Sequence, residues 1–206
     1  MRVLFLGTDE VAVPTLRLLY DSMAGKGEFG GLVRSLDVIC PGPRPIRRRG
    51  KRYTTPTPVH AFSHSHSIPT HLIPHGLRRF RDWDGIGAEE GGLEGGGKRG
   101  LFGGEYDDAF DVGVVVSFGY MVGAKVRKLC KDGILLNMHP SLLPRFRGAS
   151  PIISTILEGD HETGVSVQLL HPTVMDGGDV LSQERVRLDG QETCDQLTAS
   201  LADIGA

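Results

Sequence analysis

The sequence predicts an α/β protein with an open, mostly parallel sheet and helices on both faces. Three observations favour this class. Short apolar runs recur along the chain, and each run is bounded by Gly, Pro or Asp. Stretches with helical character separate most of these runs. Continuous apolar runs of this length are typical of parallel strands buried on both faces. The 206 residues are enough for one well-packed core, so we expect a single main domain over residues 1–206.

The chain is expected to open with a strand and a helix. "RVLFLG" (2–7) has the character of a core strand, and "EVAVPTLRLLYDSM" (10–23) places apolar residues at near-helical spacing. Pro14 is tolerated there only in a first helical turn. Further apolar runs predict strands at 36–40, 70–74, 111–119 and 133–139.

The second half continues the alternation and then changes. "AKVRKLC" (124–130) and "SPIISTILEG" (150–159) are the clearest later helices, the second with Ser150 as N-cap, Pro151 in its first turn and Gly159 as its end. Two runs with strand character follow, at 164–171 and 180–188, and the Gly-rich turn "MDGGD" joins them. A last helix is predicted at 193–204.

Two segments do not fit a sheet. Residues 82–105 are so rich in Gly and charge that we predict a flexible insertion. Residues 41–58 combine prolines with a run of cations, which predicts an exposed basic loop without helix or strand. The cations of this loop are Arg44, Arg47, Arg48, Arg49, Lys51 and Arg52.

The composition is that of an ordinary soluble globular protein. Hydrophobic residues make up 39%, charged residues 23%, and the net charge is −2, so no global field points to nucleic acid. We expect no membrane segment, because no apolar stretch approaches ~20 residues. The three cysteines lack metal or redox spacing and are expected to be reduced.

Two other functions are disfavoured by their motifs. The tract "HAFSHSHSIPTHLIPH" (60–75) is rich in histidine but lacks the acidic or thiol partners of a zinc site, so we expect no metal. "LGTDEVA" after the first strand lacks G-x-G-x-x-G, which disfavours a nicotinamide enzyme.

The stretch "NMHPSLLPRFRG" (137–148) carries the main chemical signal. Side chains alternate along a strand, so Asn137 and His139 should share one face while Met138 points into packing. Pro140 ends the strand, which places both groups at the carboxyl end of a parallel strand, where open α/β sheets bind ligands. An amide donor beside an imidazole suits a reaction in which a carbonyl oxygen gains negative charge, such as acyl or formyl transfer.

An imidazole has an ordinary pKa of ~6.5 and needs a nearby carboxylate to stay cationic at neutral pH. Asp176 is our candidate, since Gly177 and Gly178 let the backbone double back toward the sheet end. Its neighbour Asp179 is the alternative acid.

Four stretches together resemble the methionyl-tRNA formyltransferase family: "VLFLGTDEVAVPTL", "NMHPSLLPRFRGASPI", "EGDHETGVSV" and "MDGGDVL". "VVVSFGYMV" supports the resemblance, which runs from Val3 to about Ile204 apart from the Gly-rich insertion. It implies a Rossmann-like formyltransferase fold and transfer of a formyl group from 10-formyltetrahydrofolate to the amine of initiator methionyl-tRNA in translation initiation. The family usually carries a further C-terminal β-barrel domain, which these 206 residues do not supply.

The resemblance also implies roles for single residues. Asn137 and His139 would stabilise the oxyanion, and Asp176 would keep His139 protonated and assist deprotonation of the amine. The folate site would be lined by Ser141, Leu142, Leu143 and Pro144. The basic loop would contact the acceptor end of the tRNA through phosphates, without base readout.

Alternatives remain at this stage. The Asn-x-His-Pro-Ser-Leu-Leu-Pro core is shared with glycinamide ribonucleotide formyltransferase and other folate-dependent formyltransferases, so it identifies the donor better than the acceptor. A catalytically silent RNA-binding domain is the rival from another class, and a solvated charge run or a targeting patch is the simpler interpretation of the loop. We expect a monomer, in the mitochondrion of a eukaryote or otherwise in the cytoplasm.

Overall fold

The computed structural model describes residues 1–48, 51–74, 77, 83 and 109–206. The elements are β1 (Arg2–Gly7), η1 (Glu10–Ala12), α1 (Val13–Met23), β2 (Ser35–Pro41), β3 (Arg44–Arg48), β4 (Lys51–Thr55), α2 (Pro58–Ser65), β5 (Thr70–Ile73), β6 (Val112–Val116), α3 (Ala124–Arg127), η3 (Lys131–Gly133), β7 (Leu135–His139), α4 (Pro151–Glu158), β8 (Glu162–Leu169), β9 (Val180–Arg187) and α5 (Cys194–Ile204). Within the described ranges no helix has the length and apolar character to cross a membrane.

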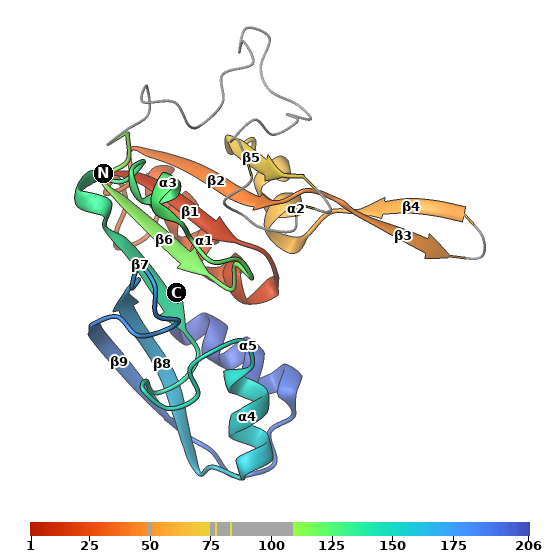
Figure 1. The fold of residues 1–206 in the computed structure, drawn as a ribbon, viewed down its shortest axis with the longest axis vertical. Coiled ribbons are helices and arrows are strands. Elements are labelled where there is room, and N and C mark those ends of the chain that lie inside the picture. Colours follow the sequence, from red (N-terminus) through yellow and green to blue (C-terminus); the bar gives the residue numbers. More distant parts are fainter. Residues whose placement is uncertain (49–50, 75–76, 78–82, 84–108) are drawn as a thin grey trace, which may run out of the picture.

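A seven-stranded sheet forms the centre of the molecule, in the order β5-β2-β1-β6-β7-β8-β9 (Figure 1). The pairs from β5 to β7 are parallel. Strands β8 and β9 are added antiparallel at one side. The predicted open, mostly parallel sheet is therefore confirmed, and its strands lie close to the predicted ranges.

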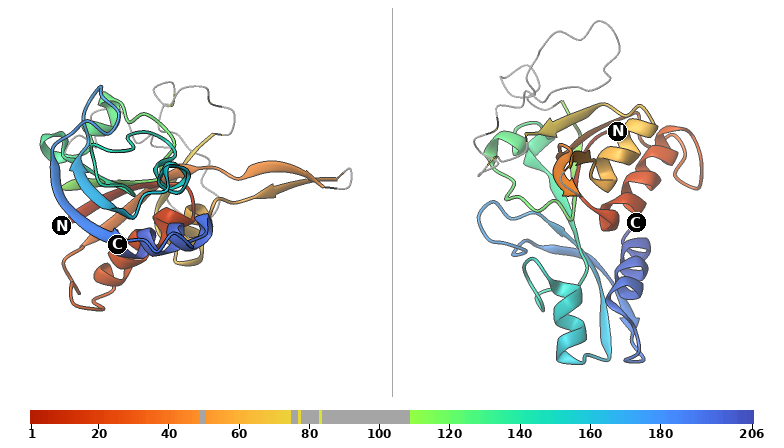
Figure 2. Two further views of the ribbon diagram at one scale, coloured as in Figure 1. Left: turned by 90° about the horizontal axis from the view of Figure 1, so that it is seen from below. Right: turned by 90° about the vertical axis from the view of Figure 1, so that its right-hand side faces the viewer.

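Apolar side chains of β1 divide between two cores, one on each face of the sheet. Val3 and Phe5 pack with residues of α1, α2 and α5, whereas Leu4 and Leu6 pack with Val126 of α3 and with irregular segments. Figure 2 shows α1 and α2 on one side of the sheet and α3 on the other. Helices on both faces are thus confirmed, and the continuous apolar run of β1 is explained by burial on both sides.

The prediction that residues 41–58 form a loop without helix or strand is wrong. Strands β3 and β4 form an antiparallel hairpin that projects away from the main sheet in Figure 1. Pro45 pairs with Thr54 in this ribbon. Each strand of a two-stranded ribbon has one unpaired edge, so a proline whose missing N–H faces outward removes no ladder hydrogen bond.

Helix α2 was not expected from the sequence, although its start carries clear signals. Thr57 Oγ1 accepts a hydrogen bond from His60 N, and Pro58 is the first helical residue. At α4 the predicted boundaries hold, and Gly159 ends the helix in a left-handed conformation, but the side chain of Ser150 makes no cap hydrogen bond.

The Gly-rich insertion predicted at 82–105 lies outside the described residues except for Trp83, which is 1% exposed and packs in the core with α3. Arg49 of the basic segment also lies outside them.

The parallel strands β1, β6 and β7 are aligned so that their carboxyl ends lie at one edge of the sheet, which is where a functional site is expected.

Candidate active site

Strand β7 presents Asn137 and His139 on one face and Met138 on the other. Met138 packs in the core with α1 and α5. Asn137 is 8% exposed and His139 is 5% exposed, so both polar groups are nearly removed from water. Buried polar groups of this kind need partners, and those partners define the site.

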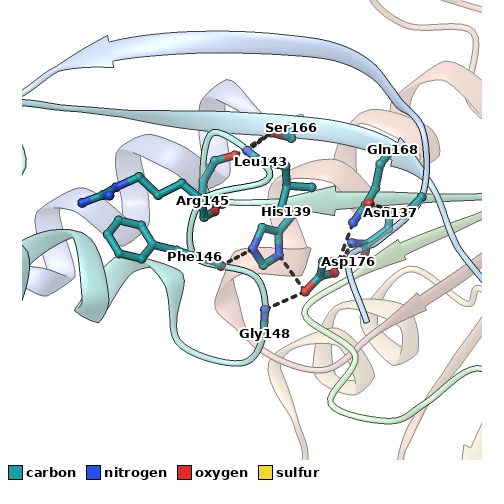
Figure 3. Close-up of polar contacts among 11 residues, drawn as sticks. Asn137, His139, Leu143, Arg145, Phe146, Gly148, Ser166, Gln168 and Asp176 are labelled. Carbon is teal, nitrogen blue, oxygen red and sulfur yellow. Dashed lines mark hydrogen bonds and ion pairs between the residues drawn. The ribbon is translucent and has the colours of Figure 1, made fainter. Parts of the chain in front are cut away.

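Asp176 is the acceptor on which these groups converge (Figure 3). Its Oδ1 accepts hydrogen bonds from Asn137 Nδ2 at 3.2 Å and from Gln168 Nε2 at 3.1 Å. Its Oδ2 accepts from the backbone N–H of Gly148 at 2.8 Å and lies 3.6 Å from His139 Nδ1. The structure therefore brings the predicted amide, imidazole and acid together, and Asp179 is exposed outside this set.

The second nitrogen of His139 is held by the chain that follows β7. Nε2 lies 2.9 Å from the carbonyl oxygen of Phe146. A carbonyl only accepts, so Nε2 must be the donor in this contact. At 3.6 Å, the contact of Nδ1 with Asp176 is an ion-pair distance rather than a hydrogen bond. The ring is thus fixed by a hydrogen bond on one side and faces the Asp176 carboxylate on the other.

The turn predicted to bind folate, Ser141 to Pro144, packs against β8. Ser141 Oγ donates to the carbonyl of Arg145 at 2.7 Å, and Leu143 N donates to Ser166 Oγ at 3.0 Å. The peptide bond between Leu143 and Pro144 is cis. This turn carries the chain to Phe146 and Gly148, which contact His139 and Asp176.

The connection between β8 and β9 carries Asp176 in a left-handed backbone conformation, with φ of 46°. A Cβ on Gly178 would lie 1.6 Å from the carbonyl oxygen of Leu169, closer than any real contact. Only glycine fits at this position, which is the physical reason for the "MDGGD" pattern.

A cavity of about 860 Å³ opens beside the three residues. Thr8 after β1, Ser117 after β6 and Pro140 after β7 line it together with Asn137, His139 and Asp176. Apolar side chains from Phe118 to Val122 and from Val174 and Met175 form other parts of the wall. The residues Ser141 to Pro144 are not part of this wall, although Pro140 is. The volume is in the range of small-molecule sites, ~300–1,000 Å³.

The basic segment reaches the cavity at one residue. Arg44, at the start of β3, lines the cavity and is exposed. Arg47, Arg48, Lys51 and Arg52 lie in the hairpin strands beyond it. The hairpin is therefore continuous with the wall of the cavity.

Gln168 is the polar site residue that the sequence analysis missed. It lies on β8 directly opposite Asn137 and is 0% exposed. A polar residue within the run "GVSVQLL" was a usable signal, but only the strand pairing shows what it contacts. Among the described residues, no three His, Cys, Asp or Glu side chains come together as a metal site.

Comparison with known proteins adds three findings. Residues 105–206 match the family model described as "Formyl transferase". The mitochondrial methionyl-tRNA formyltransferase of Mus musculus is 35% identical over 206 residues, covering 100% of this chain and 43% of the relative. The methionyl-tRNA formyltransferase of Ehrlichia chaffeensis is 31% identical, covering 100% and 58%. The chain spans about half the length of these relatives.

Solved structures share the fold. Phosphoribosylglycinamide formyltransferase from Bacillus halodurans superposes with a TM-score of 0.65 at 19% identity, covering 100% of this chain and 89% of that one. An N-formyltransferase from Helicobacter canadensis, in complex with folinic acid and dTDP-3-aminofucose, gives 0.61 at 16% identity, covering 100% and 60%. At these identities the likeness establishes a common architecture.

Proposed function

We propose that the chain is a formyl transferase and that it transfers a formyl group from 10-formyltetrahydrofolate to the amino group of methionyl-tRNA. The observation that carries this proposal is the convergence of Asn137, His139 and Asp176 at the edge of one cavity. The identity of 31–35% with methionyl-tRNA formyltransferases favours this acceptor.

In the proposed reaction the acceptor amine attacks the formyl carbon, and the carbonyl oxygen takes up negative charge. The Asn137 amide is a donor suited to that oxygen. The His139 Nε2–H is donated to the carbonyl of Phe146 in the structure, so its donation to the oxyanion is proposed to replace that contact. Asp176 holds both side chains and can accept a proton from the amine as the C–N bond forms. The bond to the folate nitrogen then breaks, the formyl C=O forms again, and the folate nitrogen is protonated.

We propose that the folate lies in the cavity beside these residues. Its flat heteroaromatic ring requires apolar walls, and the segment from Phe118 to Val122 contributes them to the same cavity. The turn from Ser141 to Pro144 lies outside the cavity wall, and we propose that it supports the folate site by carrying the chain from Pro140 to Phe146 and Gly148. No metal is needed for any of these steps.

An assay that compares methionyl-tRNA with glycinamide ribonucleotide as the formyl acceptor tests this assignment. With 10-formyltetrahydrofolate as donor, we expect formylation of methionyl-tRNA and none of glycinamide ribonucleotide. Formylation of the ribonucleotide instead would favour the other folate-dependent class. Tight tRNA binding without transfer to either acceptor would favour a silent RNA-binding domain.

The β3–β4 hairpin is proposed to bind the tRNA through phosphates. We predict that the double variant Arg47→Ala/Arg52→Ala makes the dependence of log Kd on log salt concentration shallower by about 2, because each lost phosphate contact removes about one unit of slope. Fluorescence anisotropy of labelled tRNA across a salt series measures this slope.

The matched control is Arg185→Ala/Arg187→Ala, which removes the same charge from β9, far from the hairpin in Figure 1. We expect this pair to leave the slope within a few tenths of the wild-type value. Equal slopes for both double variants would show that only net charge matters and would remove the hairpin from the binding surface.

Folate occupancy can be measured without any assay of activity. Burial raises the pKa of the Cys40 and Cys130 thiols to about 12, so both stay protonated and inert near neutral pH. Cys194 is exposed and lines the cavity. We predict a single iodoacetamide adduct on the folded protein by mass spectrometry, at Cys194, and slower labelling when a folate analogue is bound.

Unprotected labelling of Cys194 at a saturating folate concentration would place the folate elsewhere.

The relatives include mitochondrial and bacterial proteins. We propose a mitochondrial location for a eukaryotic source, a cytoplasmic one otherwise, and a monomeric state that sedimentation tests.

A further inference from the structure

Gln168 is a fully buried polar side chain that none of the proposed reaction steps uses. It lies on β8, where its backbone pairs with Asn137 of β7. Residues that face each other in an antiparallel pair project to the same side of the sheet. Figure 3 shows both amides directed at Asp176. A side chain at 0% exposure keeps its polar atoms there only because they have partners.

The two ends of the Gln168 amide hold the Asp176 turn at two points. Nε2 donates to Asp176 Oδ1 at 3.1 Å, and Oε1 accepts from the backbone N–H of Gly178 at 3.2 Å. Exchanging the nitrogen and the oxygen would place two donors together at Gly178 and two acceptors together at Asp176. The chemistry of the partners therefore fixes the orientation of this amide.

We propose that Gln168 is a positioning residue for formyl transfer, acting through Asp176; the inference rests on the proposed function of this site. Asp176 is in a left-handed conformation on a long connection, so its carboxylate needs side-chain contacts to stay in place. Gln168 fixes Oδ1, to which the Asn137 amide also donates. It thereby sets where the Asn137 amide meets the reacting oxygen and where the carboxylate faces the His139 ring.

Two variants separate the effect of the Gln168 N–H donor from the effect of the size of its side chain. Gln168→Leu removes both hydrogen bonds, and we expect kcat to fall about 10–100-fold with KM for the folate within about twofold. Gln168→Glu has the same shape and keeps the acceptor for Gly178 N. At neutral pH, however, it places a carboxylate against Asp176 Oδ1.

The pH profile then tests the donor itself. When the carboxylate introduced by Gln168→Glu is protonated, it gains an O–H that can donate to Asp176, so the ratio of Gln168→Glu to wild-type kcat should rise as the pH is lowered. The nearby groups Asp176, His139 and Asp179 are present in both proteins, and the introduced carboxylate titrates together with Asp176, so the ratio reports the protonation of that carboxyl pair. A ratio that stays flat with pH, or a Gln168→Leu variant with wild-type kcat, would overturn the proposal.

A spectroscopic signal tests the same geometry without activity. Asn137 is the only asparagine in the chain, so asparagine-selective ¹⁵N labelling gives one pair of side-chain amide resonances. We expect this pair to shift in Gln168→Leu and not in Gln196→Leu, which removes the capping box of α5 instead. An unchanged Asn137 signal in Gln168→Leu would contradict the positioning role. Absence of transfer by the wild type, with the shift present, would instead contradict the proposed function alone.

Discussion

Substitution of Asp176 by asparagine is expected to lower kcat for formyl transfer by roughly 10²–10⁴-fold, the usual contribution of a general acid–base group. The carboxylate accepts three hydrogen bonds and lies beside the His139 ring. An amide at this position has one oxygen instead of two and no negative charge. One of the donors must therefore face an N–H₂ group, and the imidazole loses the carboxylate beside it.

Asp179→Asn is the matched control for this experiment. Asp179 lies three residues further along the same connection, and its side chain is exposed. We expect wild-type kcat for this variant. Steady-state formylation of methionyl-tRNA by both variants, with circular dichroism to check folding, decides between the two acids. An inactive Asp179→Asn variant beside an active Asp176→Asn variant would assign the proton transfer to Asp179.

The parallel strands of the main sheet were predictable from sequence because a continuous apolar run indicates burial on both faces. "RVLFLG" shows this directly, since Val3 and Phe5 enter one core while Leu4 and Leu6 enter the other. The hairpin was not predictable by the same rule. Its two strands, "RPIRR" and "KRYTT", contain no continuous apolar run, and Pro45 suggested irregular chain until the pairing with Thr54 showed an edge position.

The geometry of Asn137 and His139 followed from strand alternation, which depends on neighbouring residues only. The partner groups required information from distant parts of the chain. Gln168 reaches Asp176 because β8 runs antiparallel to β7 in one particular register. The carbonyl of Phe146 reaches His139 because the residue has φ of 55°, which the apolar pattern does not encode. Local rules thus predicted the side chains that we propose to react and missed those that support them.

Replacement of Asn137 by alanine is expected to lower kcat by about 10²–10³-fold, or about 3–4 kcal/mol in the barrier, as for loss of one oxyanion donor. The Asn137 amide donates one N–H to Asp176 and lines the cavity, so its second N–H is available to a formyl oxygen. KM for the folate should change little, because the interaction strengthens only as charge develops on that oxygen.

A fall in kcat without a comparable loss of stability distinguishes the oxyanion role of Asn137 from a purely structural one. Asp176 Oδ1 keeps the Gln168 hydrogen bond when Asn137 is removed, so the acid stays satisfied and the melting temperature should fall by only a few degrees. Stopped-flow or steady-state kinetics with saturating tRNA, together with thermal unfolding, measures both effects. A rise in KM at constant kcat would mean that Asn137 binds the substrate equally in the ground and transition states, and the oxyanion role would then fail.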